Sequence, residues 1–198
     1  MAHSLTDFKS KLVGGGARPN LFEVEISPGE LPVGGLDGDT FKYLCKAAQL
    51  PASNVASIDV PFRGRTFKVA GDRTFDTWTI TVINDTDFAI RTVMEEWMQY
   101  VAQYQEGSGA TTPASYMASA TVRQLGRLRS NLGNGEGNSK GTGLEAIAVY
   151  KFADIFPTNI SAIDLSYDTS DTIEEFTVEF QVQYWYPESK DGPSGNGA

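Results

Sequence analysis

The chain of 198 residues is long enough for one domain with a sizeable core, and its 40% hydrophobic content is that of a globular protein rather than a disordered one. It carries 16 Lys and Arg against 25 Asp and Glu, and the resulting net charge of −9 argues against a nucleic-acid clamp, which needs a basic face. The same charge allows a surface past which DNA slides without sticking.

The single cysteine cannot form an internal disulfide, and the N-terminal residues show no signal-peptide pattern. No stretch approaches the roughly 20 apolar residues that span a bilayer. We therefore expect a soluble protein that does not enter a membrane and is assembled in a cytoplasm.

The first half of the chain predicts an arm followed by short strands. Residues 1–20 form the arm, which is weakly amphipathic and then rich in glycine. A loop with Pro51 and small residues is expected over Gln49–Ser57. Alternating apolar and polar residues predict strands over 21–27, 41–47, 57–61, 65–70 and 77–84, the third and fourth forming a hairpin.

One helix is expected over residues 87–105. The cluster Asn84–Asp87 before it supplies N-cap side chains and an acidic first turn. Apolar residues then recur at spacings of three and four, which predicts one buried stripe made of Ile90, Val93, Met94, Trp97, Val101 and Tyr104.

The second half predicts further strands, over residues 117–125, 144–152, 160–167 and 173–186, with a turn at Pro157–Asn159 before the third of them. Between the first two lies a Gly-rich loop, 127–143, that we expect to be mobile. It is not a phosphate-binding loop, because Lys140 is followed by Gly141 and a strand comes next instead of a helix. The polar tail 187–198 is expected to be flexible.

These elements predict a mainly β fold, a β-sandwich or barrel subunit with one flanking α-helix. The chain shows no internal repeat and no domain boundary, so residues 1–186 are expected to form a single domain.

The sequence offers little that could carry catalysis. His3 lies in the arm and Cys45 in a strand, too few for a nucleophile pair held rigidly or for a zinc site, so we expect no enzyme activity, metal or cofactor. Glu175 and Glu179 lie on one face of a strand. Such a face is most often solvated, although it could also line an aqueous passage or serve a hydrolase.

Several segments that run in order along most of the chain resemble the tail tube proteins of T-even-type contractile-tailed bacteriophages. The most specific of them is KVAGDRTFDTWTITVIND, residues 68–85. The others are ARPNLFEVEIS (17–27), LCKAAQLPA (44–52), SATVRQLGR (119–127) and FPTNISAIDLSYDTSDTIEEFTVEFQVQYWY (156–186). The Gly-rich stretch 130–143 and the tail after Tyr186 depart from the family pattern.

The resemblance implies a β-sandwich subunit that assembles as homo-hexameric rings, stacked into a tube whose wall is a closed multi-subunit β-barrel. The implied partners are the tail sheath protein, the baseplate and tail terminator proteins, and, inside the channel, the tape measure protein and transiting DNA without specific DNA binding. The implied location is the virion tail.

The resemblance also implies roles for named residues. The loop over Gln49–Ser57 is similar to the family's ring-to-ring stacking loop, with the candidates Gln49, Leu50, Pro51, Ala52, Ser53 and Asn54. The motif residues are Gly71, Asp72, Arg73, Phe75 and Trp78. We expect Gly71-Asp72 to be a turn pair and the two aromatics to be anchors. Arg73 is expected to have a carboxylate or carbonyl partner, because an arginine is not readily buried unpaired.

Two polar strand faces are candidates for the channel wall. One carries Thr77, Thr79 and Thr81, and the other carries Glu175, Thr177 and Glu179 along with glutamines. The first is preferred because it lies within the most specific segment.

Three alternatives remain from the sequence. The chain could be the inner-tube protein of a non-phage contractile injection or type VI-like system, a β-sandwich binding module with Tyr184, Trp185 and Tyr186 as an aromatic platform, or a hydrolase that uses Glu175 or Glu179.

Overall fold

The computed structural model describes residues 5–12, 16–36, 39–129, 144–168 and 171–188. Within these residues the fold is mainly β, as predicted. The helices are α1 (Leu5–Lys11), α2 (Asp39–Leu44), α3 (Ala89–Val101) and α4 (Pro113–Tyr116). The strands are β1 (Phe22–Ser27), β2 (Cys45–Ala48), β3 (Ser53–Phe62), β4 (Arg65–Phe75), β5 (Trp78–Ile83), β6 (Ala118–Arg129), β7 (Leu144–Ile160), β8 (Glu175–Gln181) and β9 (Tyr184–Pro187).

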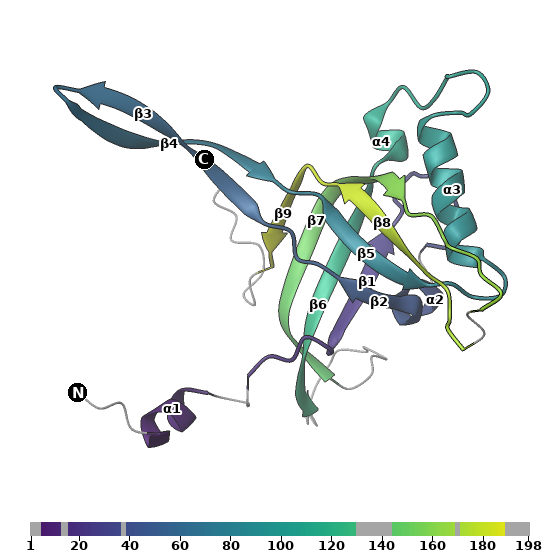
Figure 1. The fold of residues 1–198 in the computed structure, drawn as a ribbon, viewed down its shortest axis with the longest axis horizontal. Helices are drawn as coiled ribbons and strands as arrows, with labels where there is room; N and C mark the ends of the chain where they lie inside the picture. Colours follow the sequence, from purple (N-terminus) through teal and green to yellow (C-terminus); the bar gives the residue numbers. More distant parts are fainter. Residues whose placement is uncertain (1–4, 13–15, 37–38, 130–143, 169–170, 189–198) are drawn as a thin grey trace, which may run out of the picture.

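Seven of these strands form one curled antiparallel sheet, and β3 with β4 forms a separate hairpin that projects from it (Figure 1). The order in the sheet is β1-β6-β7-β8-β5-β2, with β9 paired to β7. The long strand β7 joins the two halves, because its first part pairs with β6 and β9 and its last part with β8. Among the described strands, β1 and β2 form the two ends of this order, so the sheet does not close within the subunit.

The core lies inside the curl and is built around aromatic side chains from both halves. Trp78 of β5 stacks on Phe152 of β7 with ring centroids 4.7 Å apart, and it also contacts Phe180 of β8 at 5.3 Å. Trp97 of α3 reaches Phe180 at 5.8 Å, so the helix packs against the same cluster. These rings are fully buried and account for much of the apolar surface removed from water.

The predicted apolar stripe of the helix is confirmed in part. Ile90, Met94 and Trp97 are buried, but the helix begins at Ala89 and ends at Val101, so Tyr104 lies beyond it and is exposed. The predicted N-cap and acidic first turn are wrong: the N-cap residue is Phe88, its side chain makes no cap hydrogen bond, and the first turn holds no acidic residue. The Asp85 carboxylate, four residues before Ala89, accepts a hydrogen bond from the Ala89 amide at 3.0 Å.

Four of the predicted elements were wrong in kind or extent. Residues 39–44 are helical, so the strand expected over 41–47 begins only at Cys45. The turn expected at 157–159 is absent, because β7 continues to Ile160 and has only a register shift at Pro157/Asn159. The strand expected over 160–167 is therefore missing, and the strand expected over 173–186 is divided into β8 and β9.

The boundaries of the expected flexible segments also shift. Strand β6 extends to Arg129, and residues 130–143 lie outside the described residues. At the other end, Pro187 belongs to β9 and the Glu188 amide donates to the Val149 carbonyl at 2.8 Å, so the chain is held up to residue 188. The rest of the tail, and His3, are also outside the described part.

Candidate assembly surfaces

The hairpin of β3 and β4 is exposed along nearly its whole length, and its two faces differ in chemistry. The register pairs Phe62 with Arg65, Val60 with Phe67 and Ile58 with Val69, so these side chains share one face. The opposite face carries polar pairs such as Asp59 with Lys68. A two-stranded hairpin has little stability of its own in water, and this one exposes an apolar face made of Ile58, Val60, Phe62, Phe67 and Val69.

The hairpin turns at Arg63 and Gly64, both of which have positive φ, 46° and 82°. This is the pattern of a type I′ turn, for which Asn-Gly is the preferred sequence. Arg63 occupies the first position of this turn, where a positive φ is unfavourable for a long charged residue. The Arg63 guanidinium lies over the Phe62 ring at 5.4 Å, which places charge and apolar surface together at the tip.

The motif residues of the 68–85 segment have roles that differ from those expected. Gly71 and Asp72 are not a turn pair: they face the single residue Ala56 in a bulge of β4, between the pairs Val55–Arg73 and Ser57–Ala70. A Cβ on Gly71 would come within 3.2 Å of the Ala56 carbonyl oxygen, which explains why a glycine fits there. Arg73 is exposed, so burial imposes no partner on it.

The root of the hairpin is attached firmly to the body of the subunit. The Gln49 amide donates to the Thr79 carbonyl at 3.1 Å, and the Asp76 amide donates to the Ala52 carbonyl at 3.1 Å. Asn54 also donates from its side chain to the Asp76 carboxylate at 3.1 Å. The residues expected to form a stacking loop thus divide into two groups: 49–52 connect β2 to the hairpin, and Ser53 and Asn54 begin β3.

The two expected anchors lie beside this root. Phe75 meets the ring of Trp185 edge-on, with centroids 6.2 Å apart, and ties the end of β4 to β9. Trp78, three residues later, is fully buried in the core. The hairpin is therefore a defined projection held by packing and hydrogen bonds at its base.

The two polar faces proposed for the channel are one surface. Strands β5 and β8 are neighbours, and their register pairs Thr79 with Glu179 and Thr81 with Thr177. Glu175 is on the same face and binds the Lys46 ammonium of β2 at 2.5 Å. Thr77 precedes β5 and is exposed. This surface, which we call the hydroxyl face, carries Thr79, Thr81, Thr177, Glu175 and Glu179 on the side of the strands opposite the core.

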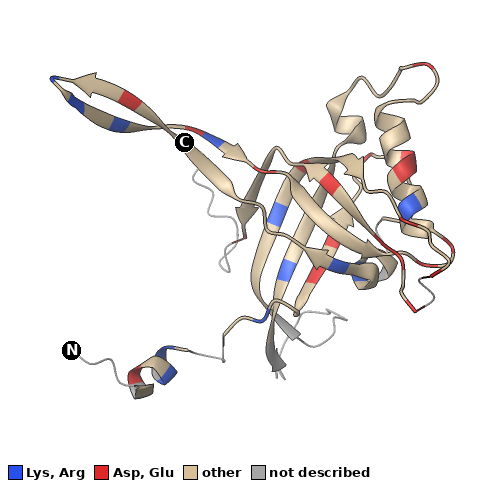
Figure 2. Ribbon diagram, in the orientation of Figure 1, with Lys and Arg blue, Asp and Glu red and all other residues tan. Residues whose placement is uncertain are grey.

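The outer side of the other half of the sheet carries charges of both signs. Arg123 of β6 binds Glu25 of β1 at 2.6 Å, and Lys151 of β7 binds Glu188 at 2.7 Å. Figure 2 shows these basic residues on β6 and β7 beside acidic residues of β1. The hydrogen bond with Glu188 raises the pKa of Lys151, which keeps this ammonium charged. The two outer faces of the sheet thus differ clearly in electrostatic character.

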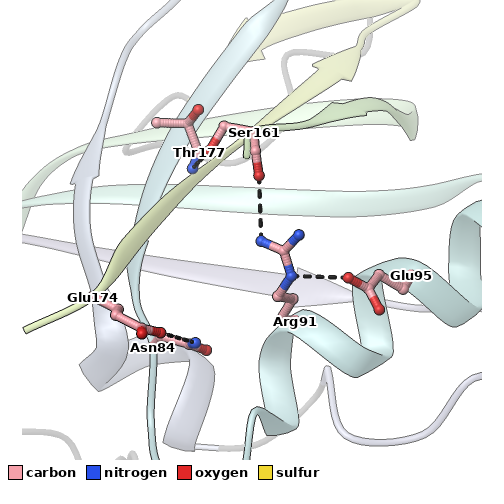
Figure 3. Close-up of polar contacts among 6 residues, drawn as sticks. All are labelled: Asn84, Arg91, Glu95, Ser161, Glu174 and Thr177. Carbon is pink, nitrogen blue, oxygen red and sulfur yellow. Dashed lines mark hydrogen bonds and ion pairs between the residues drawn. The ribbon is translucent and has the colours of Figure 1, made fainter. Parts of the chain in front are cut away.

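The described residues after β7, 162–168 and 171–173, are mostly exposed, and hydrogen bonds hold the chain on either side of them (Figure 3). At its start, Ser161 exchanges hydrogen bonds with Thr177, and Arg91 of α3 donates to the Ser161 carbonyl at 3.3 Å while binding Glu95 at 2.8 Å. At its end, the Asn84 side chain donates to the Glu174 carboxylate at 3.1 Å. These contacts hold the segment against the ends of β5, β8 and α3.

This segment borders a groove of about 660 Å³. Its lining combines apolar and acidic side chains: Ile163, Leu165, Tyr167 and Ile173 with Asp164, Glu174 and Glu175. No Lys or Arg occurs between residues 161 and 175. Leu165 is 81% exposed and Ile173 is 73% exposed, so their apolar surface is available to a partner.

None of the alternative sites in the sequence forms a catalytic or binding constellation in the described residues. Glu175 and Glu179 are four residues apart on one strand, roughly 13 Å at the strand rise, which exceeds the carboxylate spacing of glycosidases. Tyr184 and Tyr186 stack on one side of β9, whereas Trp185 points to the other side and packs on Tyr150, so the three do not form one platform.

The described part of the chain contains no group of three His, Cys, Asp or Glu that could hold a metal ion. Burial raises the pKa of the Cys45 thiol to about 12, so it stays protonated near neutral pH and is a poor nucleophile. No helix in the described residues has the length and apolarity needed to cross a bilayer.

Sequence reasoning missed the apolar face of the hairpin and the groove. The alternation of apolar and polar residues over 58–62 and 65–69 is visible in the sequence. Such alternation predicts a strand with one buried face, but it does not indicate that the surface covering this face belongs to another subunit. The groove depends on where residues 162–167 and 172–175 lie once β7 has continued past Pro157 to Ile160, which no local pattern indicates.

Comparison with known proteins gives consistent results. The family model described as phage tail tube protein matches residues 17–188. The chain is 37% identical over 172 residues to the tail tube protein gp19 of Enterobacteria phage T4, covering 85% of this chain and 90% of that protein. It is 36% identical, with the same coverage, to the corresponding protein of Enterobacteria phage T6.

Among solved structures, the fold is similar to a chain of the sheath–tube complex of an extracellular contractile injection system, PVC, in the extended state. The TM-score is 0.59 at 14% sequence identity, with 95% of this chain and 99% of that chain covered. At this level of identity the likeness concerns the fold alone.

Proposed function

The chain belongs to the phage tail tube protein family, and on that premise we propose that it is the structural subunit of a phage tail tube, in which stacked hexameric rings form the channel for genome delivery. The observation that carries the proposal is the 37% identity to the T4 tail tube protein over most of both chains. The resemblance identified from the sequence is thereby confirmed at the level of the family.

The open sheet supports ring formation. Strands β1 and β2 each have one paired neighbour among the described strands, so backbone donors and acceptors remain on their outer edges. Unpaired edges favour pairing with another chain, and a closed ring of subunits removes them. We propose that the sheet continues across neighbouring subunits to form the closed multi-subunit β-barrel.

The hairpin and its root supply a contact between rings in this proposal. Residues Gln49–Asn54 fix the direction in which β3 and β4 leave the body, and the exposed apolar face then needs a surface on another subunit. The contact between rings was expected at the loop over Gln49–Ser57. We now propose that it also includes the rest of the hairpin formed by β3 and β4. The bulge at Gly71-Asp72 strengthens the twist of the hairpin and helps to aim it.

The hydroxyl face is proposed to line the channel. Its threonines are neutral, Glu175 is paired with Lys46 of β2, and Glu179 adds negative charge. A duplex passing a basic wall would be retained through the release of counterions, whereas a neutral or acidic wall lets it pass. The opposite outer face, with Arg123 and Lys151, is less suited to the channel and is proposed to face outward.

Thiol labelling of assembled tubes tests the channel assignment. Thr79→Cys and Glu179→Cys, each in a Cys45→Ser background, are expected to react with a small maleimide but slowly with a long polyethylene-glycol maleimide, which cannot enter the tube. Ser119→Cys, on the exposed outer side of β6, is expected to react with both. The unsubstituted protein is expected to label slowly, because Cys45 is buried and protonated.

Rapid modification of positions 79 and 179 by the long reagent in assembled tubes would refute the channel assignment and leave the tube intact. Protection of these positions from both reagents would place them in a subunit interface, which also contradicts the assignment. Unassembled subunits, in which both positions should label with either reagent, provide the reference rate.

The remaining partners follow from the same premise. We propose that the tube is enclosed by the sheath protein, ends at baseplate and tail terminator proteins, and holds the tape measure protein and then DNA, without specific DNA binding. The subunit is a component of the virion tail and is proposed to assemble in the host cytoplasm. We propose that its role is structural, without enzyme activity and without a cofactor.

A second candidate function is the inner tube of a non-phage contractile injection system. The fold similarity to a chain of the PVC sheath–tube complex favours it. The sequence identity to that chain is 14%, against 37% to the T4 protein, so the phage tube is preferred. Isolation of the protein from virions that contain DNA would decide for the phage tube, and its isolation from DNA-free particles would decide for the alternative.

A further inference from the structure

The tip of the hairpin combines exposed aromatic side chains with unpaired positive charge. Phe62 and Phe67 are 66% and 65% exposed and lie on the same face. Arg63 follows Phe62, and Arg65 is paired with Phe62 across the hairpin. Asp59, the one acidic residue between Ser57 and Ala70, lies 3.9 Å from Lys68. The chain has a net charge of −9, but the surface of the hairpin tip is basic and apolar.

The groove lined by residues 162–167 and 172–175 has the complementary properties. It is about 660 Å³ in volume, which is room for aromatic side chains, and its lining is apolar and acidic. Asp164 and Asp168 are exposed at this segment and no basic residue lies within it. The hydrogen bonds of Ser161 and Glu174 hold the chain on either side of the lining residues.

We propose that the hairpin tip of one subunit inserts Phe62 and Phe67 into this groove of a second copy of the chain, with Arg63 and Arg65 pairing with the acidic side chains at its rim. The inference rests on the proposed function and specifies the surface on which the hairpin docks. The complementarity of charge and of apolar surface within one chain is what identifies a second copy as the partner.

The geometry excludes docking within one subunit and gives the contact a direction. The hairpin tip and the chain between β7 and β8, whose described residues line the groove, lie toward opposite ends of the longest axis of the molecule (Figure 1). Each copy therefore has a hairpin tip at one end and a groove at the other. The contact between them is heterologous, and it can repeat from one copy to the next. Repetition of this kind builds rings or stacks, whereas a self-complementary contact would stop at a dimer.

Arg63 gives this proposal independent support and a sharp test. Asn at position 63 would suit the type I′ turn better than Arg does, so Arg63→Asn preserves the hairpin while removing one charge. If the side chain of Arg63 served only the turn, the substitution would leave assembly unchanged or improve it. We expect it instead to raise the concentration at which tubes form severalfold, and Arg63→Lys to restore much of the loss.

The decisive experiment reverses the charges on both sides. The hairpin variant carries Arg63→Glu and Arg65→Glu, and the groove variant carries Asp164→Lys and Asp168→Lys. Each alone is expected to raise the critical concentration for assembly, measured by sedimentation, at least about tenfold. Mixed in equal amounts, the two variants are expected to co-assemble. The acidic hairpin of the first variant then meets the basic groove of the second, and the native basic hairpin of the second meets the native acidic groove of the first.

The control variant changes the charge equally elsewhere: Glu30→Lys with Glu106→Lys, both exposed and neither part of the groove lining, is expected to assemble like the parent. If either reversed variant assembled normally, or if the mixture failed to co-assemble while circular dichroism showed both variants folded, the docking assignment would be overturned. That result leaves the tube function standing. Absence of rings or tubes from the unmodified chain would instead contradict the proposed function itself.

Discussion

Replacing residues 58–69 with an Asn-Gly turn that joins Ser57 to Ala70 is expected to give a folded subunit that no longer forms tubes. Every residue removed is exposed, and the remaining pairs keep their register up to Ser57–Ala70. Shortening the hairpin changes loop-closure entropy only slightly, so the free energy of unfolding should change by less than about 1 kcal/mol. Assembly, in contrast, loses the whole apolar face of the projection.

Equilibrium denaturation measures the first effect, and sedimentation with electron microscopy measures the second. A matched pair of variants separates the two faces of the hairpin. Val60→Ser with Phe67→Ser removes a directly paired couple from the apolar face, and Asp59→Ser with Lys68→Ser removes the neighbouring couple from the polar face. The first is expected to abolish tubes and the second to retain them. Long tubes from the hairpin replacement would show that stacking uses another surface.

This design differs from a deletion of residues 52–56, which the sequence alone would suggest. In the structure those residues reach into β3, and Ser53 and Asn54 pair with Phe75 and Thr74. Their removal would shift the register of the hairpin and break the Ala52 and Asn54 hydrogen bonds to Asp76. The loss of tubes would then have a trivial explanation, because the root of the hairpin would be damaged.

The sequence predicted best where burial and alternation coincide. Trp78, Ile80 and Val82 are buried on one side of β5, and Phe176, Val178 and Phe180 on one side of β8, as their spacing indicates. These strands have one face on the core, so period two appears directly in the residue types. The polar faces were found for the same reason, but only the register shows that Thr79 lies opposite Glu179.

The errors arose where tertiary structure overrides local preference. Residues 39–44 alternate weakly and contain aromatics, yet they form a helix that buries Phe41. Pro157 suggested a turn, but it lies within β7 next to a register shift. Gly71-Asp72 has the composition of a turn and forms a bulge, because the opposing strand continues past it.

Trp78→Ala is expected to reduce the free energy of unfolding by about 3–5 kcal/mol, because it leaves a large cavity at the centre of the core. The indole ring is fully buried between Phe152 and Phe180, which belong to β7 and β8, so its removal loosens the packing between the two halves of the sheet. Urea denaturation of the unassembled subunit measures the change. Tyr184→Ala, on the exposed side of β9, serves as the surface control and is expected to cost much less.

A comparison of two conservative substitutions tests the description of the core more finely. The Trp97 indole donates to the Tyr116 carbonyl at 2.7 Å, whereas the Trp78 indole nitrogen is buried without a partner in the described structure. Trp97→Phe therefore leaves a carbonyl unsatisfied and should cost about 1 kcal/mol more than Trp78→Phe. Equal losses, or a larger loss at position 78, would contradict these contacts.

Electron microscopy of the purified chain, at high concentration and with a nucleating baseplate, tests the central claim most directly. A tail tube subunit with open sheet edges and a projecting hairpin is predicted to form rings with six-fold symmetry that stack into hollow tubes. A folded protein that remains monomeric under both conditions, with no rings at any concentration, would contradict the claim.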